Sequence, residues 1–233
     1  MPWRAVVFDF FNTLTSSVRR GPHHARIARM LGCDPKVFLD VLDRTFLERA
    51  RGGYGSAIDG LRLVAEQAGG RPGRAQLLAA IEERIVAVRA DGPLRSDAVP
   101  VLRTLRGLGL RTAVVSDCWF ELPLFLPGLP VAPLLDARVF SVQVGATKPH
   151  PAMYLTACEG LGVEPHECLY IGDGGSRELT GAQCVGMSAV RLAAPDLGGH
   201  LTFNAEPDWD GPTIRALGEL PALLSRTPQM AGV

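Results

Sequence analysis

The sequence predicts an α/β fold, in which a doubly wound parallel sheet forms the core and an all-helical domain is inserted after the first strand. Residues 4–10 read RAVVFDF, a β-branched and aromatic run that is typical of a buried strand. Between about residues 16 and 91, apolar side chains recur three and four positions apart, which indicates amphipathic helices. From residue 93 onward, helical patterns alternate with short apolar runs, as in parallel strands joined by right-handed crossovers.

Gly32, Gly52, Gly69 and Gly92 punctuate the helical segment, so we expect about four helices and no strand within it. Further strands are expected at 111–115, 138–144, 168–171 and 187–191. Further helices are expected near 97–108, 151–161, 176–184 and 212–225, and the Pro-, Gly- and Asp-rich residues 194–211 predict a surface loop. Because the first strand belongs to the same sheet as the later ones, residues 1–15 and 93–233 are expected to form the core and residues 16–92 the inserted domain.

The composition excludes several classes of protein. The 233 residues include 24 basic and 24 acidic side chains, so the chain has no net charge with which to capture nucleic acid or an anionic membrane. No stretch approaches the length of a membrane span, and the N-terminal run has neither a charged leader nor a cleavage site, so we expect a cytoplasmic protein. Five scattered cysteines, an odd number, indicate reduced thiols. The sequence gives no indication of the oligomeric state.

Four polar side chains are expected at the carboxyl ends of strands, where open parallel sheets bind ligands. They are Asp9, Ser116, Lys148 and Asp173. Two carboxylates near a phosphate suit Mg²⁺, and a lysine beside a carboxylate can bind the phosphate and keep the carboxylate ionised as a nucleophile. Lys148 is one of only two lysines among the 24 basic residues, which favours a specific role for its compact ammonium.

The motifs that contain these residues resemble those of the haloacid dehalogenase (HAD) superfamily of hydrolases. They occur in the family's order as DFFNTL (9–14), VVSD (114–117), TKPHP (147–151) and YIGDGGSRELTGA (170–182), and residues 16–92 stand where the family carries a helical cap on its Rossmann-like core. The resemblance implies that Asp9 is a nucleophile that forms an aspartyl-phosphate. It also implies that Ser116 and Lys148 hold the transferring phosphoryl group, with Asn12 and Asp117 as further phosphate-binding residues.

The resemblance implies a Mg²⁺ ion as well. Its ligands would be Asp9, the backbone carbonyl of Phe11 and Asp173. Glu178 stands where the family places a second acidic group, which binds the metal through water or steadies the lysine. The expected ligand is a small phosphorylated molecule, with no nucleic acid or membrane as partner.

Phe11 departs from the family pattern, because phosphatases of the family carry a second aspartate at this position as general acid and base. We therefore expect a Mg²⁺-dependent phosphatase of small esters whose turnover is impaired. One alternative is a metal-free 2-haloacid dehalogenase; those enzymes also lack the second aspartate, but their last motif lacks the Gly172-Asp173 pair found here. The other alternative is a catalytically weak protein that binds a phosphorylated ligand or a partner.

Other polar residues are expected to be structural. His23 and His24, which follow Arg19 and Arg20, are interpreted as a solvated helix start, and the alternative is that they contact the substrate. His150 and His166 flank turns and have no metal-ligand spacing.

Overall fold

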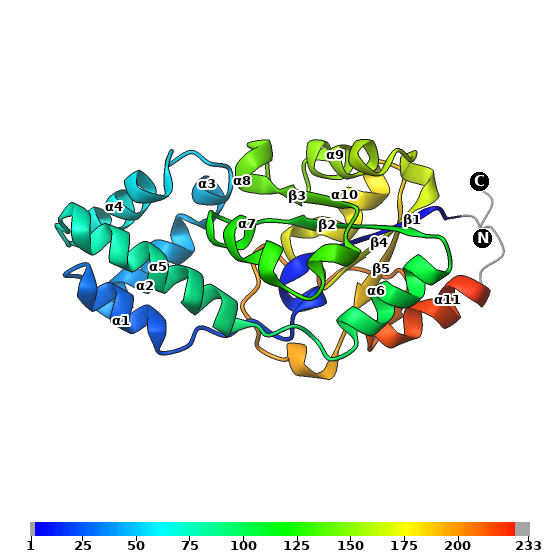
Figure 1. Cartoon of the computed structure of the whole chain (residues 1–233), viewed down its shortest axis with the longest axis horizontal. Coiled ribbons are helices and arrows are strands. Elements are labelled where there is room, and N and C mark those ends of the chain that lie inside the picture. The colour runs from blue at the N-terminus through cyan, green and yellow to red at the C-terminus, as the bar shows by residue number, and fades with distance from the viewer. Residues whose placement is uncertain (1–2, 227–233) are drawn as a thin grey trace.

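The computed structural model describes residues 3–226, and its centre is a six-stranded parallel sheet in the order β3-β2-β1-β4-β5-β6 (Figure 1). The strands are β1 (Ala5–Phe8), β2 (Arg111–Ser116), β3 (Ala137–Phe140), β4 (Cys168–Gly172), β5 (Ser188–Leu192) and β6 (Thr213–Ile214). All pairs are parallel, which confirms the predicted α/β fold with a doubly wound sheet.

The central strand β1 is buried on both faces, as its continuous apolar sequence predicts. Phe8 pairs with Val114 of β2 on one side and with Ile171 of β4 on the other, and every residue of β1 is fully buried. The chain runs from β1 outward through β2 and β3 and then returns to the other side of β1 at β4. A crevice for ligands is expected beside β1, where the direction of winding reverses.

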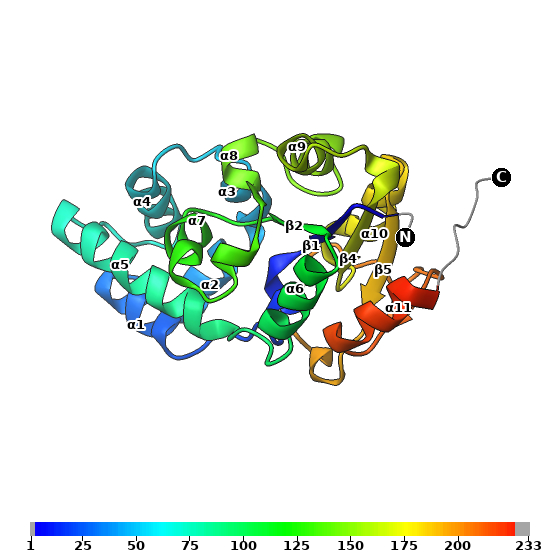
Figure 2. The same cartoon turned by 45° about the vertical axis from the view of Figure 1, so that its right-hand side comes forward.

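Helices cover both faces of the sheet (Figures 1 and 2). Helices α6 (Ala98–Gly107) and α11 (Leu220–Arg226) pack on the face that carries Val6 and Phe8. Helices α9 (Pro151–Leu161) and α10 (Glu178–Cys184) pack on the face that carries Ala5 and Val7. The alternation of β1 side chains therefore contributes to two separate apolar clusters.

Residues 16–92, here called the helical block, form five helices at one end of the molecule (Figure 1). They are α1 (His23–Met30), α2 (Pro35–Arg44), α3 (Phe46–Ala50), α4 (Ala57–Gln67) and α5 (Arg74–Asp91). The number exceeds the expected four because the short helix α3 follows α2 directly. The block has its own apolar cluster, which includes Trp119 from the segment after β2. Its two connections to the rest of the chain lie side by side, since Thr15 and Leu94 form an antiparallel bridge.

Two expected elements differ from the structure. The strand expected at 138–144 ends at Phe140 and continues as helix α8 (Ser141–Val144), although its residues favour a strand. The reason is tertiary: the Ser141 hydroxyl accepts a hydrogen bond from the Cys118 backbone N–H (2.9 Å) and donates one to the Cys118 carbonyl (3.1 Å). In the expected helix 212–225, Thr213 and Ile214 instead pair with β5, and helix α11 begins only at Leu220.

Helix α7 (Glu121–Phe125) follows Trp119 and packs against α5 of the helical block. Between residues 3 and 226, none of the helices has both the length and the apolar character needed to cross a membrane.

Candidate active site

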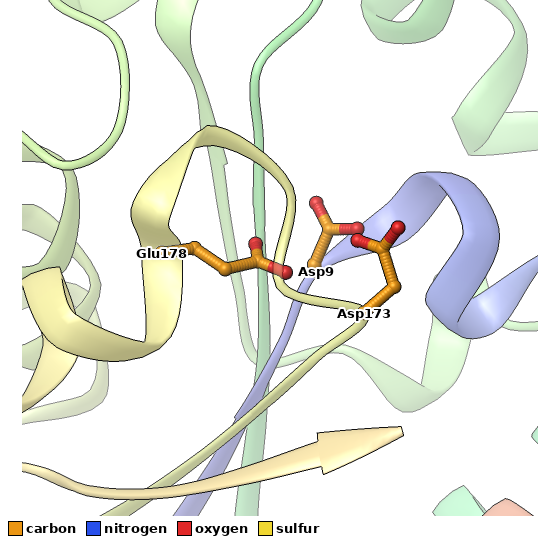
Figure 3. Close-up of side chains that lie close together, drawn as sticks. All are labelled: Asp9, Asp173 and Glu178. Carbon is orange, nitrogen blue, oxygen red and sulfur yellow. The ribbon is translucent and has the colours of Figure 1, made fainter. Parts of the chain in front are cut away.

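Three carboxylates meet at the carboxyl edge of the sheet. Asp9 directly follows β1, and its backbone N–H donates to the Ile171 carbonyl (2.9 Å). Asp173 directly follows the neighbouring strand β4, and Glu178 begins helix α10. Figure 3 shows the three side chains directed toward one another, and one oxygen of each lies within 4.8 Å of the others. Adjacent parallel strands therefore bring together residues that are 164 positions apart in the chain.

Lys148 connects two of these carboxylates. Its Nζ lies 2.6 Å from Asp9 Oδ1 and 2.5 Å from Glu178 Oε2, and its side chain is 3% exposed. The Tyr170 hydroxyl also donates to Glu178 Oε2 (2.8 Å). A buried ammonium thus holds Asp9 in a fixed position, while the other oxygen of Asp9 remains available to a ligand.

Glu178 can lie in this position because residue 172, which it contacts, is a glycine. A Cβ atom at Gly172 would overlap the Glu178 carboxylate, so glycine at this position lets the side chain lie against strand β4. The Gly174 N–H donates to Glu178 Oε1 (3.0 Å). Both oxygens of Glu178 consequently accept hydrogen bonds from the protein.

The cluster carries an excess of negative charge, because three carboxylates face one ammonium. Burial raises the pKa of Asp9 to about 6, with a further rise from the charge of Asp173 and only partial compensation by Lys148. Burial also raises the pKa of Glu178 well above its usual value. Although burial by itself would lower the pKa of Lys148, the charges of Asp9 and Glu178 raise it well above its usual value. The excess negative charge and the hard oxygen donors fit a Mg²⁺ ion.

The second strand end supplies Ser116 and Asp117, and both are buried. The Ser116 Oγ is without a hydrogen-bond partner among the described residues, and so is Asp117 Oδ2. Asp117 Oδ1 accepts a hydrogen bond from the backbone N–H of Lys148 (2.9 Å), which fixes the loop that carries the lysine. Burial raises the pKa of Asp117. The two oxygens without a partner, Ser116 Oγ and Asp117 Oδ2, therefore belong to adjacent residues, and Asp117 also fixes the backbone of Lys148.

Asn12 and Phe11 form the turn after Asp9. Asn12 adopts the left-handed conformation (φ 64°), which asparagine tolerates better than most residues. Its side-chain amide bonds to the Leu201 carbonyl (3.1 Å) and to the Val18 N–H (2.8 Å), so it joins the turn to the loop around residue 200. The Phe11 ring lines the cavity described next and packs edge-on against Phe10 at 5.1 Å. Neither side chain is acidic, so neither replaces a missing general acid.

A cavity of about 160 Å³ extends from the carboxylates to the helical block. Asp9, Asp117, Lys148 and Asp173 line one end of it, and α2, α3 and α5 of the helical block contribute to the other. An apolar cavity of about 150 Å³ admits a molecule the size of benzene, so this space suits a small ligand.

Two histidines, His200 and His24, contribute to the site. His200 Nε2 lies 2.9 Å from Asp173 Oδ2, and this contact helps to lower the pKa of Asp173 against the effect of burial. The residue belongs to the predicted surface loop, whose composition gives no signal of a contact with residue 173. The expectation of a solvated His24 is wrong: it is buried, bonds to Asp91 Oδ2 (2.6 Å) through Nε2 and lines the cavity. His23, its neighbour, is partly exposed and pairs with Glu83 (2.8 Å).

A family model described as haloacid dehalogenase-like hydrolase matches residues 3–186. The chain belongs to this family of hydrolases. The match includes all four motifs and the helical block, so the carboxylate cluster lies within the part of the chain that defines a HAD-like hydrolase.

Curated relatives of this HAD-like chain include phosphatases. A glyceraldehyde 3-phosphate phosphatase from Methanopyrus kandleri is 33% identical over 97 residues, which are 41% of this chain and 42% of the relative. A phosphoserine phosphatase from Thermus thermophilus is 32% identical over 130 residues, which are 55% of this chain and 51% of the relative. The matched region thus spans about half the length of each relative.

Solved HAD structures share the fold over nearly the whole chain. A 2-haloacid dehalogenase from Pseudomonas syringae pv. Tomato DC3000 superposes with a TM-score of 0.69 at 22% identity, covering 96% of this chain and 99% of that structure. A HAD phosphatase from Thermococcus onnurineus gives a TM-score of 0.62 at 23% identity, with coverages of 95% and 97%. A HAD family enzyme from Bacteroides thetaiotaomicron, complexed with magnesium and inorganic phosphate, gives 0.60 at 17% identity, with coverages of 89% and 98%. At these identities the similarity establishes the HAD fold.

Proposed function

We propose that the protein is a Mg²⁺-dependent phosphatase of small phosphate esters, with Asp9 as the nucleophile. The observation that carries this proposal is the buried Lys148 ammonium, which bonds to both Asp9 and Glu178 beside Asp173 at the end of a cavity. The arrangement holds a carboxylate nucleophile in place and provides positive charge for the phosphoryl group. The phosphatases among the curated relatives support the choice of substrate.

In the first step, the Asp9 oxygen that is not bonded to Lys148 attacks phosphorus, and the bond from phosphorus to the ester oxygen breaks. The ester oxygen leaves with the bonding electron pair and takes its proton from solvent, because Phe11 cannot donate one. Lys148 and the unpartnered Ser116 hydroxyl bind oxygens of the transferring group. In the second step, water attacks the aspartyl-phosphate, which releases inorganic phosphate and restores the Asp9 carboxylate.

A Mg²⁺ ion would be held by Asp9, the Phe11 carbonyl and Asp173, and it would neutralise charge on the phosphoryl oxygens. Glu178 either binds this ion through water or orients Lys148. Its two oxygens already accept bonds from Lys148, Tyr170 and Gly174, which supports the second role.

We further propose that the helical block serves as a cap that excludes water and selects the substrate. Two contacts between the block and the core support this role. The rings of Phe46 and Phe203 stack with centroids 4.2 Å apart, and Arg84 forms a buried ion pair with Glu121.

Phe11 supports a second candidate function, metal-free dehalogenation of a 2-haloacid. In that reaction Asp9 displaces a halide, a leaving group that needs no proton, so the absence of an acid at position 11 has no cost. The acidic cluster with Asp173 favours the phosphatase, because a displacement without metal gains nothing from the additional negative charge. A third candidate is a protein that binds phosphorylated ligands with negligible turnover.

A panel of phosphorylated metabolites and 2-haloacids, assayed with and without Mg²⁺, distinguishes the three. Phosphate release that requires Mg²⁺ and is lost in Asp9→Asn supports the proposal. Halide release without metal indicates the dehalogenase. Tight binding of inorganic phosphate with neither product indicates the third candidate.

A further inference from the structure

The helical-block end of the cavity contains two buried arginines that the proposed chemistry does not use. Arg49 at the end of α3 is 4% exposed, and Arg84 in the middle of α5 is 5% exposed. Both line the cavity, together with Trp119 from the segment after β2. Their guanidinium carbons lie 4.7 Å and 5.6 Å from the centroid of the Trp119 ring, so both cations contact one aromatic side chain.

Arg84 is paired but retains an unused donor. Its Nε donates to Glu121 Oε1 (2.6 Å), and its Nη2 contacts the same oxygen. Its Nη1 is buried and makes no hydrogen bond to any described residue. A buried N–H without an acceptor is costly, and a ligand oxygen would satisfy it.

Arg49 has no counter-ion. Its Nε donates to Thr45 Oγ1 (3.1 Å) and its Nη2 to the Leu42 carbonyl (2.5 Å), both of which are neutral acceptors. Within residues 3–226, no carboxylate lies within ion-pair distance of it. Burial and the charge of Arg84 lower the pKa of Arg49 to about 9, so the group remains protonated at neutral pH. A buried and unpaired cation is strongly unfavourable unless an anion joins it.

The charges around Trp119 indicate how much negative charge the ligand brings. Two guanidinium groups face one carboxylate, that of Glu121, which leaves a surplus of one positive charge. The carboxylates of Asp43 and Asp91 bond to Arg20 and His24, and neither forms an ion pair with Arg49 or Arg84. The planar donors of arginine match the two oxygens of a carboxylate.

We propose that Arg49 and Arg84 bind a carboxylate of the substrate, so that the substrate is a small phosphate ester that also carries a carboxylate group. This inference rests on the proposed phosphatase function and adds the chemical class of the substrate. The phosphate occupies the Asp9 end of the cavity and the carboxylate occupies the Trp119 end.

The first test compares esters that differ only in the carboxylate: phosphoglycolate with ethyl phosphate, and 4-carboxyphenyl phosphate with phenyl phosphate. Charge-assisted hydrogen bonds predict a preference of about 10-fold to 100-fold in kcat/KM for the carboxylated member, mainly through KM. Hydrolysis without this preference, or a preference for a bisphosphate, overturns the inference and leaves the proposed function intact. No hydrolysis of any ester overturns the proposed function instead.

Variants separate this role from a structural one. Arg49 bonds to a carbonyl at the end of α2, and Arg49→Gln retains hydrogen-bond donors there without the charge. We expect Arg49→Gln to lose the preference for carboxylated esters while its activity on phenyl phosphate persists, and Arg49→Lys to retain part of the preference. Arg29→Gln, on the exposed surface of α1, is the matched control. Equal losses on both members of a pair in Arg49→Gln would indicate a structural role and overturn the inference.

Calorimetry gives a measurement that does not depend on turnover. The Asp9→Asn variant is titrated with phosphoglycolate and with ethyl phosphate, and the titrations are repeated in the Asp9→Asn/Arg49→Gln double variant. If Asp9→Asn binds phosphoglycolate more tightly than ethyl phosphate and the double variant does not, the inference is supported. Equal affinity for the two probes, or binding of neither, overturns it even if Arg49→Gln alone does not fold.

Discussion

Replacing Asp9 by Asn tests the electrostatics of the carboxylate cluster through folding stability. In the folded protein the pKa of Asp9 is raised from 3.8 to about 6 by burial. Between these pH values the folded protein keeps the Asp9 proton, whereas the unfolded chain has released it. The contribution of Asp9 to stability is therefore full below pH 3.8 and is lost as the pH rises through about 6.

The magnitude follows from the size of the shift. A rise of about two pKa units corresponds to about 3 kcal/mol, which the wild-type protein loses between about pH 4 and pH 7.5 in the absence of metal. Asparagine does not ionise, so the Asp9→Asn variant does not incur this loss. The unfolding free energy of the variant relative to that of the wild type should increase by about 3 kcal/mol over the same interval.

The assay is urea unfolding of both proteins in EDTA at a series of pH values. Asp40→Asn, on the exposed surface of α2, serves as the control for a carboxylate outside the cluster. Added Mg²⁺ should stabilise the wild type and leave Asp9→Asn unchanged, because binding to the folded state alone raises stability. Parallel pH profiles for the wild type and Asp9→Asn would refute the reasoning.

Three further substitutions test other parts of the site. Lys148→Arg should reduce kcat by about 10²-fold or more at unchanged charge, because a planar guanidinium cannot occupy the place between Asp9 and Glu178. Steady-state kinetics check this prediction, and a kcat near that of the wild type would contradict it. The wild type should hydrolyse aryl phosphates faster than alkyl phosphates and show a phosphoenzyme burst, whereas Phe11→Asp should raise alkyl-phosphate turnover by up to about 10²- to 10⁴-fold. Equal rates of the wild type on aryl and alkyl phosphates, without a burst, would show that another residue acts as acid and base. Gly172→Ala should cost about 1 to 3 kcal/mol of stability and reduce activity, because its methyl group displaces Glu178; an unaltered thermal midpoint would contradict this.

The sequence predicts the architecture well where local patterns and tertiary contacts agree. The buried strand β1 is an example, because its apolar run is required for a central parallel strand. At residues 141–144 the two disagree: the residues favour a strand, but the hydrogen bonds of Ser141 to Cys118 hold a helix. Contacts of this kind join segments that are 23 residues apart, and no local pattern reveals them.

The candidate site likewise contains some residues that the sequence predicts and others that it does not. Asp9, Lys148 and Asp173 could be predicted because each lies in a recognisable motif near the end of a strand. The contact of His200 with Asp173 and the burial of His24 could not, since both depend on how separate segments fold over the sheet edge. Arg49 and Arg84 belong to this second group, because only three-dimensional packing distinguishes them from the other arginines whose burial the structure describes.

The bridge between Thr15 and Leu94 has a consequence for the evolution of the protein. Since the helical block begins and ends at one place, its helices can be lengthened, shortened or exchanged without disturbing β1 or α6. Trp119 is one core residue that such an exchange would affect, along with Glu121 and Phe203, because it lies within the apolar cluster of the block and against Gly60 of α4. Relatives that carry a different set of inserted helices should therefore also differ at position 119, while the residues of the carboxylate cluster stay the same.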